Sequence, residues 1–381
     1  MDFDLTVEQR KRQGELLDAV RARFGGAGPE DRREPEPFPD RWRAAAALGL
    51  TGLCLPREHG GGGLGALDTA LALEAFGRGC PDTGLAFAVA AHLLACGVPV
   101  RDFASGQVRG DLLAGMAGGS LVAANAITED GAGSDVGALA VTARRDGDGY
   151  VLDGEKSFAS NAPAAGLLVT YAVTDPRAGF LGISGFAVPR GLPGIEVGAP
   201  FGKMGLDGCP AGRVRFRGCR VPARHLLGAE GQGSAIFQHS MGWERGCLFA
   251  LYLGMMAEQL DRCVRHAASR RQFGRPIGGF QAVSHRIAAM AQRLESARLL
   301  LYRACWLMDA GADHVAAVSL SKVATSEAAV ANSLDALQIF GGAGYLTATG
   351  IERNLRDAVA SRIFSGTNEI HRELIAREAG L

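Results

Sequence analysis

Residues 126–135 have the sequence AITEDGAGSD, and residues 154–161 have the sequence GEKSFASN. Both stretches combine glycine with hydroxyl-bearing side chains, so they predict turns that present hydroxyl and backbone N–H donors to a polar ligand. Short runs of apolar residues bounded by Gly, Pro and Asp surround them, at 141–144, 150–153, 167–171 and 185–188. Such runs are typical of strands, so this part of the chain is predicted to be a β-domain.

Outward from this segment the apolar residues recur every three or four positions, which is the period of amphipathic helices. The pattern predicts an N-terminal helical domain over residues 1–120, a middle β-barrel or sandwich domain over 121–226 and a C-terminal helical domain over 227–381. The long helices expected in the last part are Ser234–His266, Gln281–Met308 and Val315–Gln338. The fold class is therefore α+β, with a four-helix bundle at the C-terminal end.

The composition excludes several classes of function. The 381 residues include 40 basic and 40 acidic side chains, so binding to nucleic acid or to a membrane through net charge is not expected. The eight cysteines show no C-x-x-C or zinc-ligand spacing, which favours buried free thiols and no metal site. The N-terminus carries charges and no apolar h-region, so a secretory signal is not expected, and no uninterrupted apolar run reaches the length of a membrane span. We expect a cytoplasmic protein.

The sequence GGGGLG at residues 60–65 formally matches the dinucleotide-binding pattern G-x-G-x-x-G. That motif requires a preceding strand and an alternation of strands and helices. Helical periodicity precedes residue 60, and no such alternation follows it. A flexible loop is therefore the better interpretation.

The two polar stretches resemble the flavin-contact segments of acyl-CoA dehydrogenases. Three further motifs of that family follow in its order: RRQFG at 270–274, QIFGGAGY at 338–345 and IFSGTNEI at 363–370. The resemblance spans essentially the whole chain. It implies the acyl-CoA dehydrogenase fold and FAD as the cofactor.

By this resemblance, Thr128 bonds the pyrimidine edge of the flavin and Ser134 its pyrophosphate, while Phe158 walls the ring and Ser160 reaches N5. Phe158 and Ser160 stand where the family often has Trp and Thr.

The resemblance also implies contacts with the FAD of a neighbouring subunit. The residues assigned to them are Arg270, Gln272, Phe273, Gln338, Gly341 and Gly342. Thr367 and Glu369 are assigned to the phosphates and ribose on the adenosine side. A homo-oligomer follows, either a dimer or, as the family suggests, a tetramer.

The catalytic base departs from the commonest family pattern. Many members carry a Glu in a Tyr-Glu-Gly-Thr sequence, where this chain has Phe364-Ser365-Gly366-Thr367. A serine hydroxyl cannot accept a proton at neutral pH without a base of its own, whereas a carboxylate in an apolar pocket can. Glu244 lies in a largely apolar helix, at a position similar to that of the base in isovaleryl- and long-chain-type members. The alternative is that Glu244 forms a buried structural ion pair with Arg245 or a neighbouring Arg, in an inactive protein.

In the implied mechanism Glu244 removes the α-proton of a thioester while the β-hydrogen passes to the flavin as hydride. The thioester carbonyl accepts a hydrogen bond from the backbone N–H of Ser365. Trp243, Arg245 and Ser365 are the predicted substrate contacts, and Trp243 would give the pocket a compact, flat shape.

Within the family, the sequences at residues 125–128, 157–163, 209–212 and 241–245 most closely resemble those of the prolyl-carrier-protein dehydrogenases. Those enzymes make pyrrole-2-carboxyl groups for antibiotics. The implied partners are a phosphopantetheine-tethered substrate on a carrier protein and, for reoxidation, an electron-transfer flavoprotein or oxygen. Arg213, Arg215 and Arg217, on one face of a predicted strand, are together with Arg220 candidates for docking the acidic carrier. The alternative, which this pattern favours, is a strand face that is solvated or turned towards another subunit. The alternatives are a short- or branched-chain acyl-CoA dehydrogenase, a flavin monooxygenase of the same fold and a non-catalytic flavoprotein.

Overall fold

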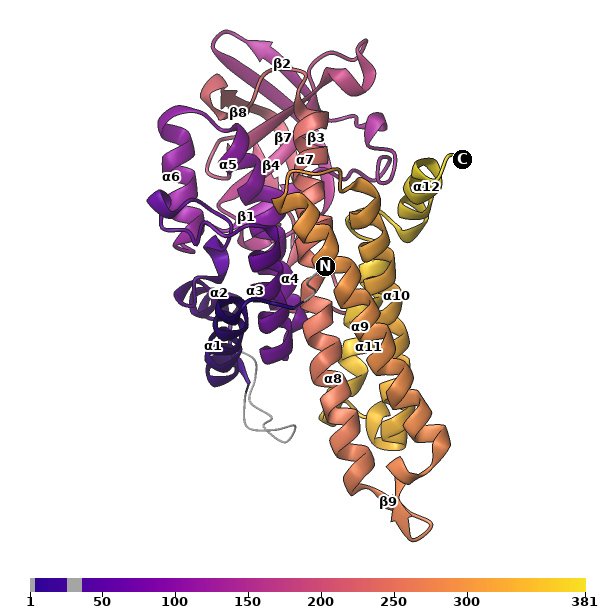
Figure 1. The fold of residues 1–381 in the computed structure, drawn as a ribbon. Coiled ribbons are helices and arrows are strands. Elements are labelled where there is room, and N and C mark those ends of the chain that lie inside the picture. Colours follow the sequence, from indigo (N-terminus) through magenta and orange to yellow (C-terminus); the bar gives the residue numbers. More distant parts are fainter. Residues whose placement is uncertain (1–3, 26–35) are drawn as a thin grey trace.

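The computed structural model describes residues 4–25 and 36–381. Helices form both ends of the chain and a sheet lies between them, as the sequence predicts (Figure 1). The N-terminal helices are α1 Val7–Phe24, α2 Phe38–Ala47, α3 Ala66–Gly79, α4 Thr83–Ala91, α5 Val98–Phe103 and α6 Gly106–Ala117. The C-terminal helices are α7 Gly233–Trp243, α8 Ala250–Ser269, α9 Gln281–Asp309, α10 Val315–Phe340, α11 Ile351–Val359 and α12 Asn368–Glu378.

The middle of the chain forms an eight-stranded mixed sheet. Its strands are β1 Ala123–Ala126, β2 Thr142–Asp146, β3 Gly149–Ser160, β4 Leu167–Val173, β5 Ile183–Pro189, β6 Ile195–Val197, β7 Ala211–Pro222 and β8 Leu226–Leu227. The order is β6-β7-β3-β2-β4-β5-β8, with β1 paired in parallel to β4. This pairing brings the turn that follows β1 next to β3, so the two polar stretches of the sequence become neighbours.

Strand β7 shows the alternation that its sequence predicts. Val214 and Phe216 are buried, and Arg213, Arg215 and Arg217, which alternate with them, lie on the other face. Each of these arginines already has a carboxylate partner in its own chain: Arg213 pairs with Asp130 and Glu155, Arg215 with Glu155, and Arg217 with Glu196. The positive charge of this face is therefore largely neutralised within the chain, which weakens its case as a docking surface for an acidic carrier.

The glycine-rich segment at residues 60–65 is a loop. Short 3-10 turns precede it rather than a strand, and helix α3 follows it. The free N-terminus of α3 is capped from the C-terminal domain, because the Asp309 carboxylate accepts hydrogen bonds from the backbone N–H groups of Ala66 (2.5 Å) and Leu67 (2.9 Å). The carboxylate satisfies donors that a helix start leaves unpaired. This confirms that the segment is no dinucleotide-binding motif.

Helix α3 packs against α8 at unusually close range. A Cβ added to Gly77 would lie 2.0 Å from the carbonyl oxygen of Leu251, and one added to Gly254 would lie 2.0 Å from that of Glu74. Glycine is required at both positions because only its absent side chain lets the two backbones meet. This contact joins the N-terminal helices to the C-terminal bundle of α8, α9, α10 and α11.

The segment Thr83–Phe103 is long and apolar enough to cross a membrane by length and composition alone. It runs from α4 through a π-helical turn at His92–Gly97 into α5. The most apolar 18 residues of the segment are entirely buried inside the protein. Such burial is typical of a helix in a protein core, which can be as long and as apolar as a membrane span. The eight cysteines are all free and buried, as the sequence predicts.

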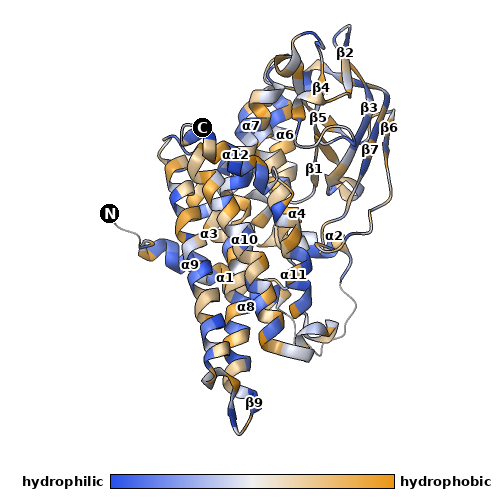
Figure 2. Ribbon diagram, turned by 90° about the vertical axis from the view of Figure 1, so that its right-hand side faces the viewer, coloured by the Kyte–Doolittle hydropathy of each residue, from blue (hydrophilic) through white to orange (hydrophobic). Residues whose placement is uncertain are grey.

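The helix expected at Ser234–His266 is interrupted. The chain forms α7, then a π-helical turn at Glu244–Leu248, then α8. The apolar period cannot reveal this change because a π-turn keeps the residues helical while adding one residue to the turn. At the far end of α8 a small hairpin of β9 (Arg271–Gln272) and β10 (Arg275–Pro276) projects beyond the bundle, opposite the sheet (Figure 1). Figure 2 shows that this hairpin and α12 are mostly hydrophilic.

Candidate active site

Glu244 opens the π-helical turn between α7 and α8 and is only 7 % exposed. π-Turns of this kind occur frequently at functional sites. Burial raises the pKa of the Glu244 carboxyl, and this effect outweighs the hydrogen bond from Ser365 and the positive charge of Arg245, which lower it. A carboxylate with a raised pKa in an apolar setting is suited to act as a general base near neutral pH.

Ser365 lies 121 positions away in the sequence, yet its hydroxyl donates a hydrogen bond to the Glu244 carboxylate. Arg245 directs its Nε–H to the carbonyl oxygen of Ser365 at 2.9 Å. Among the described residues no ion pair joins Glu244 to Arg245 or to any other arginine, so the structure does not contain the pair that the alternative interpretation requires. Trp243 is half-buried, and the guanidinium of Arg101 from α5 lies over its ring at 4.5 Å.

The turn at residues 126–135 is held from inside by a buried ion pair. Lys156 of β3 donates to the Glu129 carboxylate at 2.7 Å and to the carbonyl oxygen of Ile127 at 3.0 Å. Glu129 also accepts hydrogen bonds from the backbone N–H groups of Ala140 (2.7 Å) and Val141 (3.0 Å). The Glu129 carboxylate thus ties the turn that carries the predicted flavin contacts to β3 and to the backbone of Ala140 and Val141.

The hydroxyls of Thr128 and Ser134 have no partner within the described part of the chain. Thr128 nevertheless has a fixed backbone, because its carbonyl oxygen accepts a hydrogen bond from the N–H of Ser157 at 2.7 Å. The Ser157 hydroxyl in turn donates to Asp130 at 2.5 Å. Positioned backbone and unused hydroxyls are the features that a polar ligand needs.

Phe158 is 63 % exposed although it lies in strand β3, and its φ of 54° is in the left-handed region. A bulky residue rarely adopts this conformation. The ring of Phe201 lies 5.7 Å from that of Phe158. The exposed ring of Phe158 and the half-buried ring of Phe201 form an apolar wall beside the turn at residues 126–135, and Ser160 is half-buried two residues further along the strand.

The second group of predicted cofactor residues is far from the first. Arg270, Gln272 and Phe273 are exposed at the hairpin, and Phe273 is 94 % exposed. The segment that carries Gln338, Gly341 and Gly342 lies beside them, because the ring of Phe340 stacks on His266 at 4.2 Å. The hairpin and the sheet occupy opposite ends of the molecule (Figure 1). One chain therefore cannot bring both groups to one ligand.

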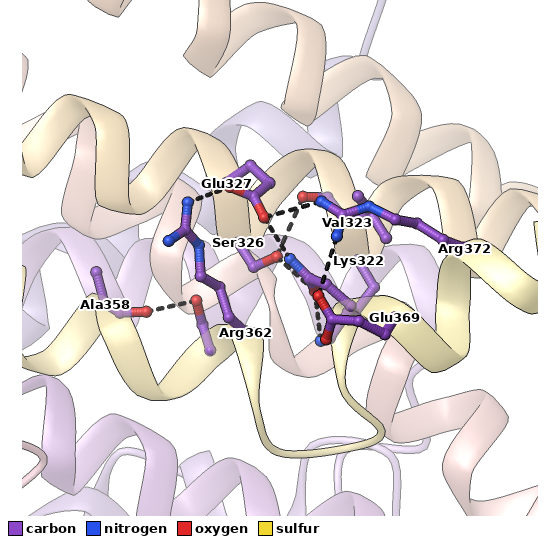
Figure 3. A network of polar contacts seen from close by, with 10 residues as sticks. Lys322, Val323, Ser326, Glu327, Ala358, Arg362, Glu369 and Arg372 are labelled. Atoms are coloured by element: carbon purple, nitrogen blue, oxygen red, sulfur yellow. Dashed lines mark hydrogen bonds and ion pairs between the residues drawn. The ribbon is translucent and has the colours of Figure 1, made fainter.

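Thr367 and Glu369 lie at the start of α12. The Thr367 hydroxyl caps this helix by accepting from the N–H of Ile370 at 3.4 Å, and Glu369 pairs with Arg372 at 3.1 Å. Figure 3 shows the polar network that ties this helix start to α10. In it the amide of Asn368 accepts from the buried Lys322 at 2.7 Å and donates to Glu327 at 2.8 Å.

Three residues of the site have no counterpart in the sequence-based prediction: His371, Ser319 and Gly366. His371 is fully buried, contacts the Ser365 carbonyl oxygen through Nε2 at 3.1 Å and contacts the Ser319 hydroxyl through Nδ1 at 3.2 Å. A weak signal for Ser319 is its helical spacing with Lys322 and Ser326 along α10. No local pattern marks His371, because its partner is a backbone carbonyl.

The fold and the site define an acyl-CoA dehydrogenase. Family models describe the N-terminal domain at residues 8–120, the middle domain at 124–219 and the C-terminal domain at 231–380. The chain belongs to this family of oxidoreductases. It is 51 % identical to the L-prolyl-[peptidyl-carrier protein] dehydrogenase of Pseudomonas fluorescens (strain Pf-5), with 100 % of both chains covered. The enzyme of the same description from a Serratia strain is 46 % identical over 89 % of this chain and 88 % of its own.

A solved structure described as PigA with FAD and proline superposes with a TM-score of 0.96. It is 42 % identical in sequence, and the match covers 100 % of both chains. The agreement confirms the three-domain arrangement of helices, sheet and helices.

Proposed function

We propose that this protein is an FAD-dependent dehydrogenase that oxidises the L-prolyl group of an L-prolyl-[peptidyl-carrier protein] towards pyrrolyl-2-carboxyl-carrier protein, as a step of antibiotic or related secondary metabolism. The reaction class rests on one observation: the buried Glu244 carboxylate, with its raised pKa, opens the π-turn and contacts the Ser365 turn. The substrate class rests on the two full-length relatives with that activity.

The residues near β1 and β3 fit an isoalloxazine ring. Phe158 and Phe201 offer an apolar wall, and the unused hydroxyls of Thr128 and Ser134 offer donors for polar edges and phosphate. Ser160 lies on the same strand, two residues beyond Phe158. When bound, FAD supplies the hydride acceptor, which no amino-acid side chain can provide.

The chain's own residues supply the proton chemistry. Glu244 accepts the α-proton, because its carboxylate is withdrawn from water and its raised pKa makes it a stronger base. The backbone N–H of Ser365 makes no hydrogen bond within the described chain, so it is free to bond the thioester carbonyl and stabilise the negative charge that develops there. Arg245 and Trp243 flank the base, and Arg101 holds the Trp243 ring in place by a cation–π contact.

We also propose that two subunits complete each cofactor site within a homo-oligomer, a tetramer as in the family. The hairpin of β9 and β10 and the segment at residues 338–342 would contact the FAD of a neighbour. The exposure of Phe273 supports this arrangement, because an aromatic ring that is 94 % exposed at the tip of a hydrophilic hairpin, with an edge contact to the ring of Phe280, buries little surface in its own chain.

Replacing Phe273 with Ser is expected to weaken FAD binding about tenfold, because the removed ring surface corresponds to roughly 1–2 kcal/mol of apolar contact. The unfolding midpoint of the isolated apoprotein should not change. FAD affinity would be measured by fluorescence titration and the assembly mass by light scattering. Val7→Ser, which removes an exposed apolar side chain of α1, is the matched control. Equal FAD affinity in both variants would contradict the shared site.

The substrate assignment is tested by anaerobic bleaching of the bound flavin. Prolyl-loaded carrier protein should bleach the flavin within one turnover, whereas a panel of short and branched acyl-CoA esters should not. Bleaching by a CoA ester alone would instead establish an ordinary acyl-CoA dehydrogenase. Repeating the reoxidation with air and with an electron-transfer flavoprotein would identify the electron acceptor.

A further inference from the structure

Ser365 adopts a backbone conformation that its own side chain does not favour. Its φ is 57°, in the left-handed region, and the following Gly366 has a φ of 90°. A non-glycine residue persists there only where the surrounding contacts determine the conformation. A Cβ on Gly366 would lie 3.2 Å from Nε2 of His371 and 3.5 Å from a guanidinium nitrogen of Arg245, so this turn is fitted closely to both side chains.

The Ser365 carbonyl oxygen is held by two donors. Arg245 donates to it through Nε at 2.9 Å, and His371 contacts it through Nε2 at 3.1 Å. Burial, with the nearby charge of Arg245, lowers the pKa of His371 to about 4, so the imidazole is neutral at working pH. The contacts then assign its proton to Nε2, which donates to Ser365, while Nδ1 accepts from the Ser319 hydroxyl.

Because Arg245 and His371 hold its carbonyl oxygen, Ser365 directs its hydroxyl to the Glu244 carboxylate and donates a hydrogen bond to it. Three elements converge to produce it: the π-turn with Arg245, α10 with Ser319 and α12 with His371. If Ser365 only occupied the position where many family members have a glutamate, none of these contacts would be needed. In this arrangement Ser365 orients the candidate base Glu244, and Arg245 and His371 in turn orient Ser365.

We propose that Ser365 is the positioning residue of Glu244: its hydroxyl holds the carboxylate in one orientation and favours its ionised form, while Arg245 and His371 hold Ser365. This inference rests on the proposed role of Glu244 as the base. Burial raises the pKa of the Glu244 carboxyl, and a hydrogen-bond donor to the ionised form opposes that effect. The Ser365 hydroxyl thus limits the rise in the pKa of Glu244, so that the carboxylate stays ionised while remaining a stronger base than one in water.

Other ionisable groups also face the base. Cys96 of the π-turn His92–Gly97 and Tyr171 of β4 interact with it, and burial raises the pKa of each, so both are neutral near pH 7. Arg245 is the adjacent cation. Lys322 of α10, whose pKa burial lowers to about 7, influences Arg245 and His371. None of these groups changes when Ser365 is replaced, so a difference between variants reports the hydroxyl.

The test compares Ser365→Ala, Ser365→Gly and Ser365→Cys in the FAD-loaded protein. Alanine and glycine both lack the donor, but glycine also relieves the left-handed backbone, so an effect common to both comes from the hydroxyl. Cysteine retains a weak donor. Ser284→Ala, at the exposed start of α9, is the matched control. The rate of anaerobic flavin reduction would be followed against pH, and the infrared carboxyl band that disappears in Glu244→Gln would be titrated without substrate.

In Ser365→Ala and Ser365→Gly the acid limb of the rate profile and the infrared midpoint should both move up by about one pH unit, since a hydrogen bond to a charged group has about that effect on a pKa. The rate below the midpoint should then fall about tenfold, with Ser365→Cys between these variants and the wild type. Unchanged midpoints in both variants, with Glu244→Gln inactive, would overturn this inference alone. Full flavin reduction in Glu244→Gln would overturn the proposed base itself.

Discussion

Glu244→Gln leaves FAD bound, with its visible absorbance, but reduces the rate of flavin reduction by the substrate about 10²- to 10⁴-fold, which is the usual contribution of a general base. The amide has nearly the shape of the carboxylate and can still accept the hydrogen bond from Ser365, so the turn should stay folded. It cannot accept the α-proton. The loss should therefore appear in the rate constant of reduction rather than in FAD content.

Anaerobic stopped-flow spectroscopy at the flavin band measures this effect directly. The matched control is Glu373→Gln, which removes an exposed carboxylate of α12 that pairs with Arg377. That variant should reduce its flavin at the wild-type rate. A Glu244→Gln protein that is reduced as fast as the control would remove Glu244 from the mechanism, and the flavin monooxygenase and the non-catalytic flavoprotein would become the leading alternatives.

Lys156→Met is expected to lower the free energy of unfolding by about 3–5 kcal/mol, because it leaves the Glu129 carboxylate buried without its cation. Lys156 is fully buried and Glu129 almost so, and no other cation contacts that carboxylate in the described chain. The loop of residues 126–135 should loosen with it, so FAD should also be retained less well. Unfolding by denaturant, followed by tryptophan fluorescence at fixed protein concentration, measures the difference.

Two further variants make this result specific. Glu129→Gln/Lys156→Met removes both charges and should recover part of the loss, since the cost arises from the unpaired charge rather than from the missing bond. Lys203→Met, at an exposed lysine, should change stability by no more than about 0.5 kcal/mol. Equal stability of Lys156→Met and Lys203→Met would contradict the structural role of the pair.

The order of helices, sheet and helices could be predicted because each element has its own local period. The alternation along β7 and the three- and four-residue spacing of the long helices are consequences of which face is buried. The sequence could also name Glu244 as a candidate base, because it is the one carboxylate in the apolar stretch from Gln238 to Ala257. What such a period cannot show is the π-turn at Glu244–Leu248, since one extra residue per turn leaves the apolar pattern almost unchanged.

The sequence by itself determined the family, the two polar stretches and the absence of a glutamate at position 365. Only the tertiary structure decided what these residues do to one another. Ser365 meets Glu244 across 121 positions, and the groups that hold it act on a backbone carbonyl, which every residue type possesses. The same holds for the pairing of Arg213, Arg215 and Arg217 with carboxylates of their own chain. Residue type and spacing report local period and chemistry, whereas the direction of a hydroxyl or the partner of a charge depends on how distant segments pack.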